Sequence, residues 1–142
     1  MLIQLAPADL DEQQRVTGHI IAYSSKRQPC VALSSTEAEY VALSKTAQSV
    51  SWLRRMLQQL GFMGDEPTIT FEDNTSCISI SYDEGLSQRT KHIDTKHHYI
   101  RDQICKGNMV VEYISTTYQL ADYFTKALPV HRFFELKMRL MC

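Results

Sequence analysis

A long run of helix-forming residues between Thr36 and Leu60 constrains the fold of this chain more than any other feature. Apolar residues recur within it at helical spacing, at Leu43, Ala47, Val50, Leu53, Leu57 and Leu60. Gly61 follows at the position where a helix end favours a residue that tolerates positive φ. The pattern predicts one amphipathic helix of about seven turns, long enough to cover a sheet.

Shorter β-rich and helical runs surround this helix. The pattern predicts strands over residues 16–24, 30–33, 68–72 and 109–115. It predicts a short helix from Thr75, a helix from about Lys91 that stops at Gly107, a helical segment over about 118–127, and a last amphipathic turn or two after Pro129. Strands alternating with helices favour an α/β fold in which a partly parallel sheet has helices against its faces.

Composition limits the class of protein. A chain of 142 residues with 44% hydrophobic residues is long enough for one domain with its own core. The formal net charge of -1 excludes a global field that would attract nucleic acid or an anionic membrane, so such contacts need local basic clusters. The sequence contains neither a signal-like segment nor an apolar run of membrane-spanning length.

Cysteine usage indicates the compartment. The four cysteines lie far apart in the sequence, at Cys30, Cys77, Cys105 and Cys142. No C-x-x-C pair occurs, which argues against a zinc ribbon, a redox motif or a dense disulfide framework. We therefore expect reduced thiols and an intracellular, cytoplasmic protein that is not bound to a membrane.

Two glutamates near the start of the long helix have different predicted roles. Glu39 precedes Leu43 by four residues, so it lies on the buried stripe and points toward the sheet. Glu37 is rotated from Glu39 by about 200° around the helix. It can close a capping box with Ser34 or serve as a favourable charge in the first turn.

Two aspartates also lie where an α/β fold gathers functional groups. Asp73 ends the strand at 68–72, and Asp122 opens the last helical segment. Ligands of open α/β sheets bind beyond the carboxyl ends of the strands, and gathered carboxylates suit Mg²⁺ or Mn²⁺. Two such ions can hold the attacking and leaving oxygens of a phosphodiester. From pattern alone, a turn or cap role for Asp73 and dipole compensation for Asp122 are favoured over a metal site.

Other candidate groups have plain structural explanations. His97 falls on an apolar stripe, so a core histidine is favoured over a metal site formed with His92 and His98. We interpret Trp52 as a packing residue rather than a base-stacking one. The basic residues could contact phosphates or form a solvated surface, and both alternatives stay open.

Four segments carry a resemblance to a known family. They are VALSSTEAEYVALSKTAQSVSWLRRMLQQLGF, FEDNTSCISI, RTKHIDTKHHYIRDQI and YQLADYFTKALP. Together they resemble the ribonuclease H domain at the C-terminal end of the Pol polyprotein of copia-type LTR retrotransposons, over roughly residues 9 to 140. The resemblance implies a five-stranded mixed sheet flanked by helices, and cleavage of the RNA strand of RNA–DNA hybrids with two Mg²⁺ ions during reverse transcription.

The resemblance also implies roles for individual residues. It makes Glu39 the catalytic, metal-binding glutamate of the T-E-A-E-Y motif, Asp73 the aspartate of the D-N motif, and Asp122 the aspartate of L-A-D-x-F-T-K. The candidate nucleic-acid contacts are Lys26, Arg27, Asn74, Arg89, Lys91 and Lys96, and for the basic residues among them a solvated surface is the open alternative.

Two departures from the family pattern affect the predicted chemistry. The family opens with a strand similar to Y-S-D-A-D-W-A-G that carries its first catalytic aspartate, whereas this chain reads MLIQLAPA and puts Ile3 or Leu5 there. About six residues of a hairpin after Ile20 are also missing. The resemblance thus implies a truncated or degenerate single domain, with a divergent N-terminus at 1–15, a core at 16–128 and a C-terminal helical extension at 129–142.

Two hypotheses about the function follow. In the first, the chain is a ribonuclease H-like nuclease, weak or inactive because the bridging aspartate is absent. Its partners are then an RNA–DNA hybrid and, within a polyprotein, adjacent reverse transcriptase and integrase regions, in the cytoplasm, a virus-like particle or the nucleus. In the second, the chain is a non-catalytic remnant with a structural or interaction role. The oligomeric state stays open in both.

Overall fold

The computed structural model describes residues 2–4, 20–26, 28, 31–62, 66–83 and 91–141. The elements in chain order are β1 (Leu2–Gln4), β2 (Ile20–Tyr23), α1 (Ser35–Gln59), β3 (Thr68–Glu72), α2 (Thr75–Tyr82), α3 (Lys91–Cys105), β4 (Met109–Tyr113), α4 (Asp122–Thr125) and α5 (Val130–Met141). They divide into two compact units, one of Cys30–Tyr113 and one of Met1–Pro29 with Ile114–Cys142. The α/β class predicted from the sequence is confirmed.

Helix α1 forms where the apolar repeat predicts it, and its ends have local causes. Ser34 Oγ accepts the N–H of Glu37 at 3.1 Å, and Glu37 Oε2 accepts the N–H of Leu33 at 2.6 Å. Glu37 thus serves the helix start, as expected. At the other end Gly61 has a φ of 74° and the N–H of Phe62 donates to Leu57 O at 2.9 Å, which closes a Schellman motif.

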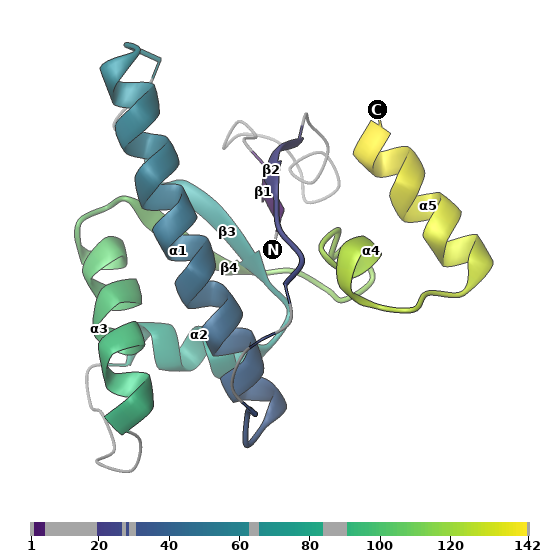
Figure 1. Cartoon of the computed structure of the whole chain (residues 1–142), viewed down its shortest axis with the longest axis horizontal. Helices are drawn as coiled ribbons and strands as arrows, with labels where there is room; N and C mark the ends of the chain where they lie inside the picture. Colours follow the sequence, from purple (N-terminus) through teal and green to yellow (C-terminus); the bar gives the residue numbers. More distant parts are fainter. Residues whose placement is uncertain are drawn as a thin grey trace. The chain divides into compact units, whose positions relative to one another are not determined.

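The unit Cys30–Tyr113 is built on two parallel strands. Strand β3 pairs with β4 in register from Thr68 opposite Met109 to Glu72 opposite Tyr113. Parallel strands require a crossover, which α2 and α3 provide here. Helices α1 and α3 lie against each other in this unit (Figure 1). Its buried core includes Leu43, Ala47, Val50, Cys77, Ile100, Met109 and Val111.

The hydroxyl of Tyr82, at the end of α2, binds the backbone of β4. Tyr82 Oη accepts the N–H of Val111 at 2.9 Å and donates to Val111 O at 3.1 Å. A single side chain therefore satisfies both backbone polar groups of that strand residue, which ties α2 to β4.

The other unit contains β1, β2, α4 and α5. Strands β1 and β2 pair antiparallel, with Ile3 opposite Ala22. The rings of Tyr123 and Phe133 stack with centroids 4.7 Å apart, which joins α4 to α5. Ile114, Leu120 and Leu136 are almost fully buried.

Several predicted elements differ from the structure. Residues 31–33 form no strand. Val31 and Leu33 are 92% and 91% exposed, and the N–H of Leu33 donates to Glu37. These β-rich residues therefore do not pair with another strand. Within 118–127 only Asp122–Thr125 is helical, because the preceding residues form consecutive turns such as Tyr118 N–H to Ser115 O at 2.7 Å. Helix α5 spans 12 residues, which is longer than the turn or two expected.

Other expectations stay predictions. The predicted strand at 16–24 is seen as β2, but residues 5–19 and Cys30 lie outside the described residues. The described strands form two two-stranded sheets, so the five-stranded mixed sheet and the single domain implied by the resemblance are not established. Among the described residues, no helix combines the length and the hydropathy needed to cross a membrane.

Candidate active site

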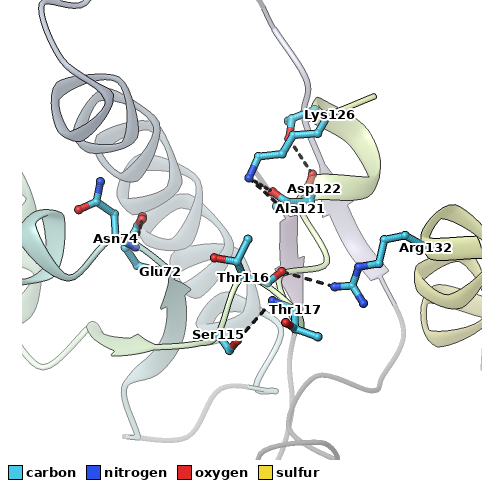
Figure 2. Close-up of polar contacts among 10 residues, drawn as sticks. Glu72, Asn74, Ser115, Thr116, Thr117, Ala121, Asp122, Lys126 and Arg132 are labelled. Carbon is cyan, nitrogen blue, oxygen red and sulfur yellow. Dashed lines mark hydrogen bonds and ion pairs between the residues drawn. The ribbon is translucent and has the colours of Figure 1, made fainter. Parts of the chain in front are cut away.

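The carboxyl end of β3 carries a buried carboxylate. Thr68, Thr70 and Glu72 alternate along the strand and are all buried, and Glu72 is 6% exposed. Glu72 Oε1 accepts the N–H of Asn74 at 3.1 Å (Figure 2). The side chain of Glu72 therefore folds back over the turn that contains Asp73.

Glu39 and Asp73 both act on Glu72 electrostatically. Burial is the largest cause that raises the pKa of Glu72, and the negative charges of Glu39 and Asp73 also raise it, while the N–H groups of Asn74 and Asp73 lower it. Together these effects raise the pKa from 4.5 to about 7. Charges act strongly only at short range. Glu39 on α1 and Asp73 after β3, the two predicted catalytic acids of this unit, therefore both lie close to Glu72.

Cys77 lies beside the same acids. Burial raises the pKa of its thiol, and the charges of Glu72, Glu39 and Asp73 raise it further. Cys77 has no exposed surface, so this residue remains a neutral, unreactive thiol. Its neighbour Tyr40 is also buried, and burial raises the pKa of the Tyr40 hydroxyl.

Asn74 links three elements around Asp73. Its Oδ1 accepts the N–H groups of Ser76 at 3.0 Å and Cys77 at 3.1 Å, which caps α2. Its Nδ2 donates to Thr36 Oγ1 in the first turn of α1 at 3.5 Å. Both polar atoms of the amide thus contact the protein itself, whereas a nucleic-acid contact was expected for this residue; that contact stays a prediction.

Asp122 belongs to the unit that comprises Met1–Pro29 and Ile114–Cys142. It is 7% exposed, and its carboxylate lies 2.9 Å from Lys126 Nζ one helical turn later (Figure 2). This ion pair holds the Asp122 side chain against Lys126 at the start of the short helix α4. The convergence of Asp122 with Glu39 and Asp73 that the resemblance implies stays a prediction.

The donor atoms of these acids suit a hard cation. Carboxylate oxygens are the ligands that Mg²⁺ and Mn²⁺ prefer. Among the residues that the structure describes, however, no three His, Cys, Asp or Glu side chains are grouped so that they could hold a metal ion. The chemistry of Glu39 and Asp73 therefore fits a metal, while a complete ligand set is not assembled from this part of the chain.

The predicted basic contacts are described only in part. Lys26 is exposed after β2. Lys91 and Lys96 lie on α3, but their side chains, like those of His92 and His97, are outside the described residues. Arg27 and Arg89 lie outside the described residues altogether.

Two residues were misjudged or missed by reasoning from the sequence. Glu72 was not considered, although the alternation in TITFE puts it on the same strand face as Thr68 and Thr70. The packing role expected for Trp52 is wrong, because its side chain is 62% exposed. The helical period already gave the signal, since Trp52 lies about 180° around the helix from Leu43.

Comparison with known proteins gives matches over most of the chain. It is 39% identical over 132 residues to the retrovirus-related Pol polyprotein from transposon TNT 1-94 of Nicotiana tabacum, which covers 88% of this chain and 10% of the relative. It is 37% identical over 110 residues to the corresponding polyprotein from transposon RE2 of Arabidopsis thaliana, covering 78% of this chain and 8% of the relative. A truncated Ty1-A Gag-Pol polyprotein of Saccharomyces cerevisiae is 31% identical over 121 residues, covering 83% and 10% respectively.

Other comparisons give no match. No family model matches the chain, and no solved structure matches it. The chain spans about a tenth of the length of the curated relatives that it matches. It is therefore homologous to a short segment of the Pol polyproteins of copia- and Ty1-type retrotransposons.

Proposed function

We propose that this chain is the ribonuclease H-type segment of a retrotransposon Pol polyprotein, directed at the RNA strand of RNA–DNA hybrids and impaired in hydrolysis. The observation that carries the proposal is the shared electrostatic action of Glu39 and Asp73 on Glu72. Both acids act on a carboxylate at the carboxyl end of a parallel strand, which is where α/β folds place their ligands.

Each acid has a defined role in this proposal. Glu39 and Asp73, joined by Asp122, would hold Mg²⁺ or Mn²⁺, with two ions in an intact site. Such ions, when bound, supply Lewis-acid stabilisation of the phosphate and a reactive water. The chain itself supplies the carboxylates. The hydrogen bond from the N–H of Asn74 to Glu72 closes the turn that contains Asp73.

Weak activity follows from the composition of β1. Leu2, Ile3 and Gln4 pair with β2 as an opening strand, but none of them carries a carboxylate. A site that lacks the bridging aspartate holds at least one ion less tightly. The same observation favours a second candidate function, a non-catalytic remnant that retains a structural or interaction role.

A cleavage assay separates the two functions. The full chain is incubated with a labelled RNA–DNA hybrid and Mg²⁺ or Mn²⁺, beside Asp73→Asn and the control Asp102→Asn. Asp102 lies on α3, and its carboxylate pairs with Lys106. The nuclease proposal expects slow cleavage that Asp73→Asn abolishes and Asp102→Asn keeps. If the wild type cleaves the hybrid with neither metal, the nuclease proposal fails and the non-catalytic remnant is the function that is left.

Restoring the missing acid tests the placement of the site. Ile3→Asp puts a carboxylate in β1, opposite Ala22. We expect it to raise Mn²⁺-dependent cleavage above that of the wild type, and the gain should vanish when Asp73→Asn is added. The exposed control Val130→Asp on α5 adds the same charge and should give no gain.

A further inference from the structure

The outward side of α1 presents a continuous polar and aromatic stripe. Its members are Lys45, Gln48, Trp52, Arg55 and Gln59. They are spaced by three or four residues, so they share one helix face, and all of them are exposed. We name this set the outer stripe; it runs for about 21 Å along the helix.

The outer stripe is cationic and contains no acid. Between Tyr40 and Gln59 the helix has no Asp or Glu. The guanidinium of Arg54 is buried and donates to Glu66 O and Thr68 Oγ1, so Lys45 and Arg55 are the exposed charges of this segment. Within the described part of the chain, neither of these two residues has an ion pair with an acid.

Trp52 lies between the two charges of the outer stripe. It follows Lys45 by two helical turns and precedes Arg55 by one, and its indole is 62% exposed. A single exposed apolar residue needs no explanation by itself. All the remaining members of the outer stripe carry hydrogen-bond donors that suit phosphate. The stripe is therefore not the wide apolar surface that a protein partner would require.

These features match the chemistry by which proteins bind single-stranded nucleic acid. Such sites combine cations that follow the phosphate backbone with an aromatic side chain on which a base stacks. We propose that the outer stripe of α1 binds single-stranded nucleic acid, with a base stacked on Trp52 and phosphates held by Lys45 and Arg55. The carboxylates near Glu72 play no part in this binding, so it stands apart from the proposed function.

The chain provides its own reporter for this binding. Trp52 is the only tryptophan in the sequence, so its fluorescence reports contact at the stripe directly. The full chain is titrated with an oligothymidylate of about 12 nucleotides in EDTA, which prevents cleavage. We expect saturable quenching of the tryptophan emission. Binding of the labelled oligonucleotide, followed by anisotropy, without any change in Trp52 emission would overturn the proposal.

Substitutions distinguish the stripe from general charge attraction. In the anisotropy assay Trp52→Ala should weaken binding about tenfold or more, and Trp52→Phe should restore much of it, because an aromatic ring at this position can stack on a base. The double variant Lys45→Gln with Arg55→Gln should lower the slope of log affinity against log salt by about 1.4. The charge-matched control Lys106→Gln with Lys137→Gln should bind like the wild type.

Unfolding measurements show whether a variant binds weakly only because its fold is destabilised. All these side chains are exposed or half-buried, so the variants should unfold at the wild-type temperature. If the stripe variants and the control pair lose affinity equally, the proposal fails. If Trp52 emission instead changes with protein concentration in the absence of the oligonucleotide, the stripe is a protein interface and the proposal also fails.

Discussion

Glu72, the last residue of β3, accepts the backbone N–H of Asn74 at 3.1 Å, across the intervening residue Asp73. The bond holds a buried carboxylate next to two further acids, Glu39 and Asp73, which both raise its pKa. Strongly perturbed pKa values cluster at functional sites, and the end of β3 is the candidate site for this reason.

The raised pKa of Glu72 predicts a pH-dependent stability in the absence of metal. The native state keeps a proton up to about pH 7, whereas the unfolded state loses it near 4.5, so unfolding becomes easier as pH rises through this window. The change amounts to about 3 kcal/mol at most. Glu72→Gln keeps an acceptor oxygen without the charge, so we expect it to flatten the dependence and to stabilise the protein above pH 7.

Urea unfolding in EDTA at several pH values from about 4 to 8 measures this effect. Glu66→Gln serves as the control, because Glu66 is exposed and its side chain is remote from the cluster at the other end of β3. A Glu72→Gln variant that retains the wild-type pH slope would show that the native carboxylate is not protonated in this window.

Asn74 should contribute to stability through its cap of α2. Asn74→Ala removes the acceptor of the Ser76 and Cys77 N–H groups and should cost about 1 kcal/mol. Asn74→Ser keeps a capping oxygen without adding a charge beside Asp73 and Glu72, and it loses the donor to Thr36, so it should stay within a few tenths of a kcal/mol of the wild type. Equal losses of unfolding free energy in the two variants would contradict a capping role.

Local signals explain which parts of the fold could be predicted. Helix α1 has its cap at Ser34, its apolar repeat and its stop at Gly61 within one segment, so the sequence alone was sufficient. Residues 31–33 are β-rich, but no strand lies beside them among the described residues. Only the tertiary structure shows that this partner is missing. A β-rich run becomes a strand only where it finds a partner, as β3 finds β4, and residues 31–33 find none among the described residues.

The candidate site was only partly predictable for the same reason. The orientation of Glu39 follows from the period of α1, and the position of Asp73 follows from the end of β3. The burial of Glu72 depends on elements that pack over the strand face, and its pKa depends on charges from α1. Trp52 was misjudged because residue type was given more weight than its place opposite the buried stripe.

Arg54 should be a stabilising residue although it lies beside the outer stripe. The residue is 7% exposed, and its Nη1 donates to Glu66 O at 2.7 Å and to Thr68 Oγ1 at 3.1 Å. Arg54→Met keeps much of the volume but leaves these acceptors unpaired, which should cost about 1–3 kcal/mol. Arg55→Met on the exposed face should cost less than about 0.5 kcal/mol, and urea denaturation of both variants tests the difference. Equal values would place Arg54 in solvent.

Tyr82 should protect the backbone of β4. Tyr82→Phe removes both hydrogen bonds to Val111, and we expect a loss of about 1–2 kcal/mol in the free energy of unfolding. It also frees an N–H and a C=O on a strand, which can then pair with another chain, so light scattering should rise with protein concentration. Tyr113→Phe is the control, because that side chain is 55% exposed at the end of the same strand. If Tyr82→Phe loses stability without increased association, the hydroxyl anchors α2 to β4 but does not shield the strand from other chains.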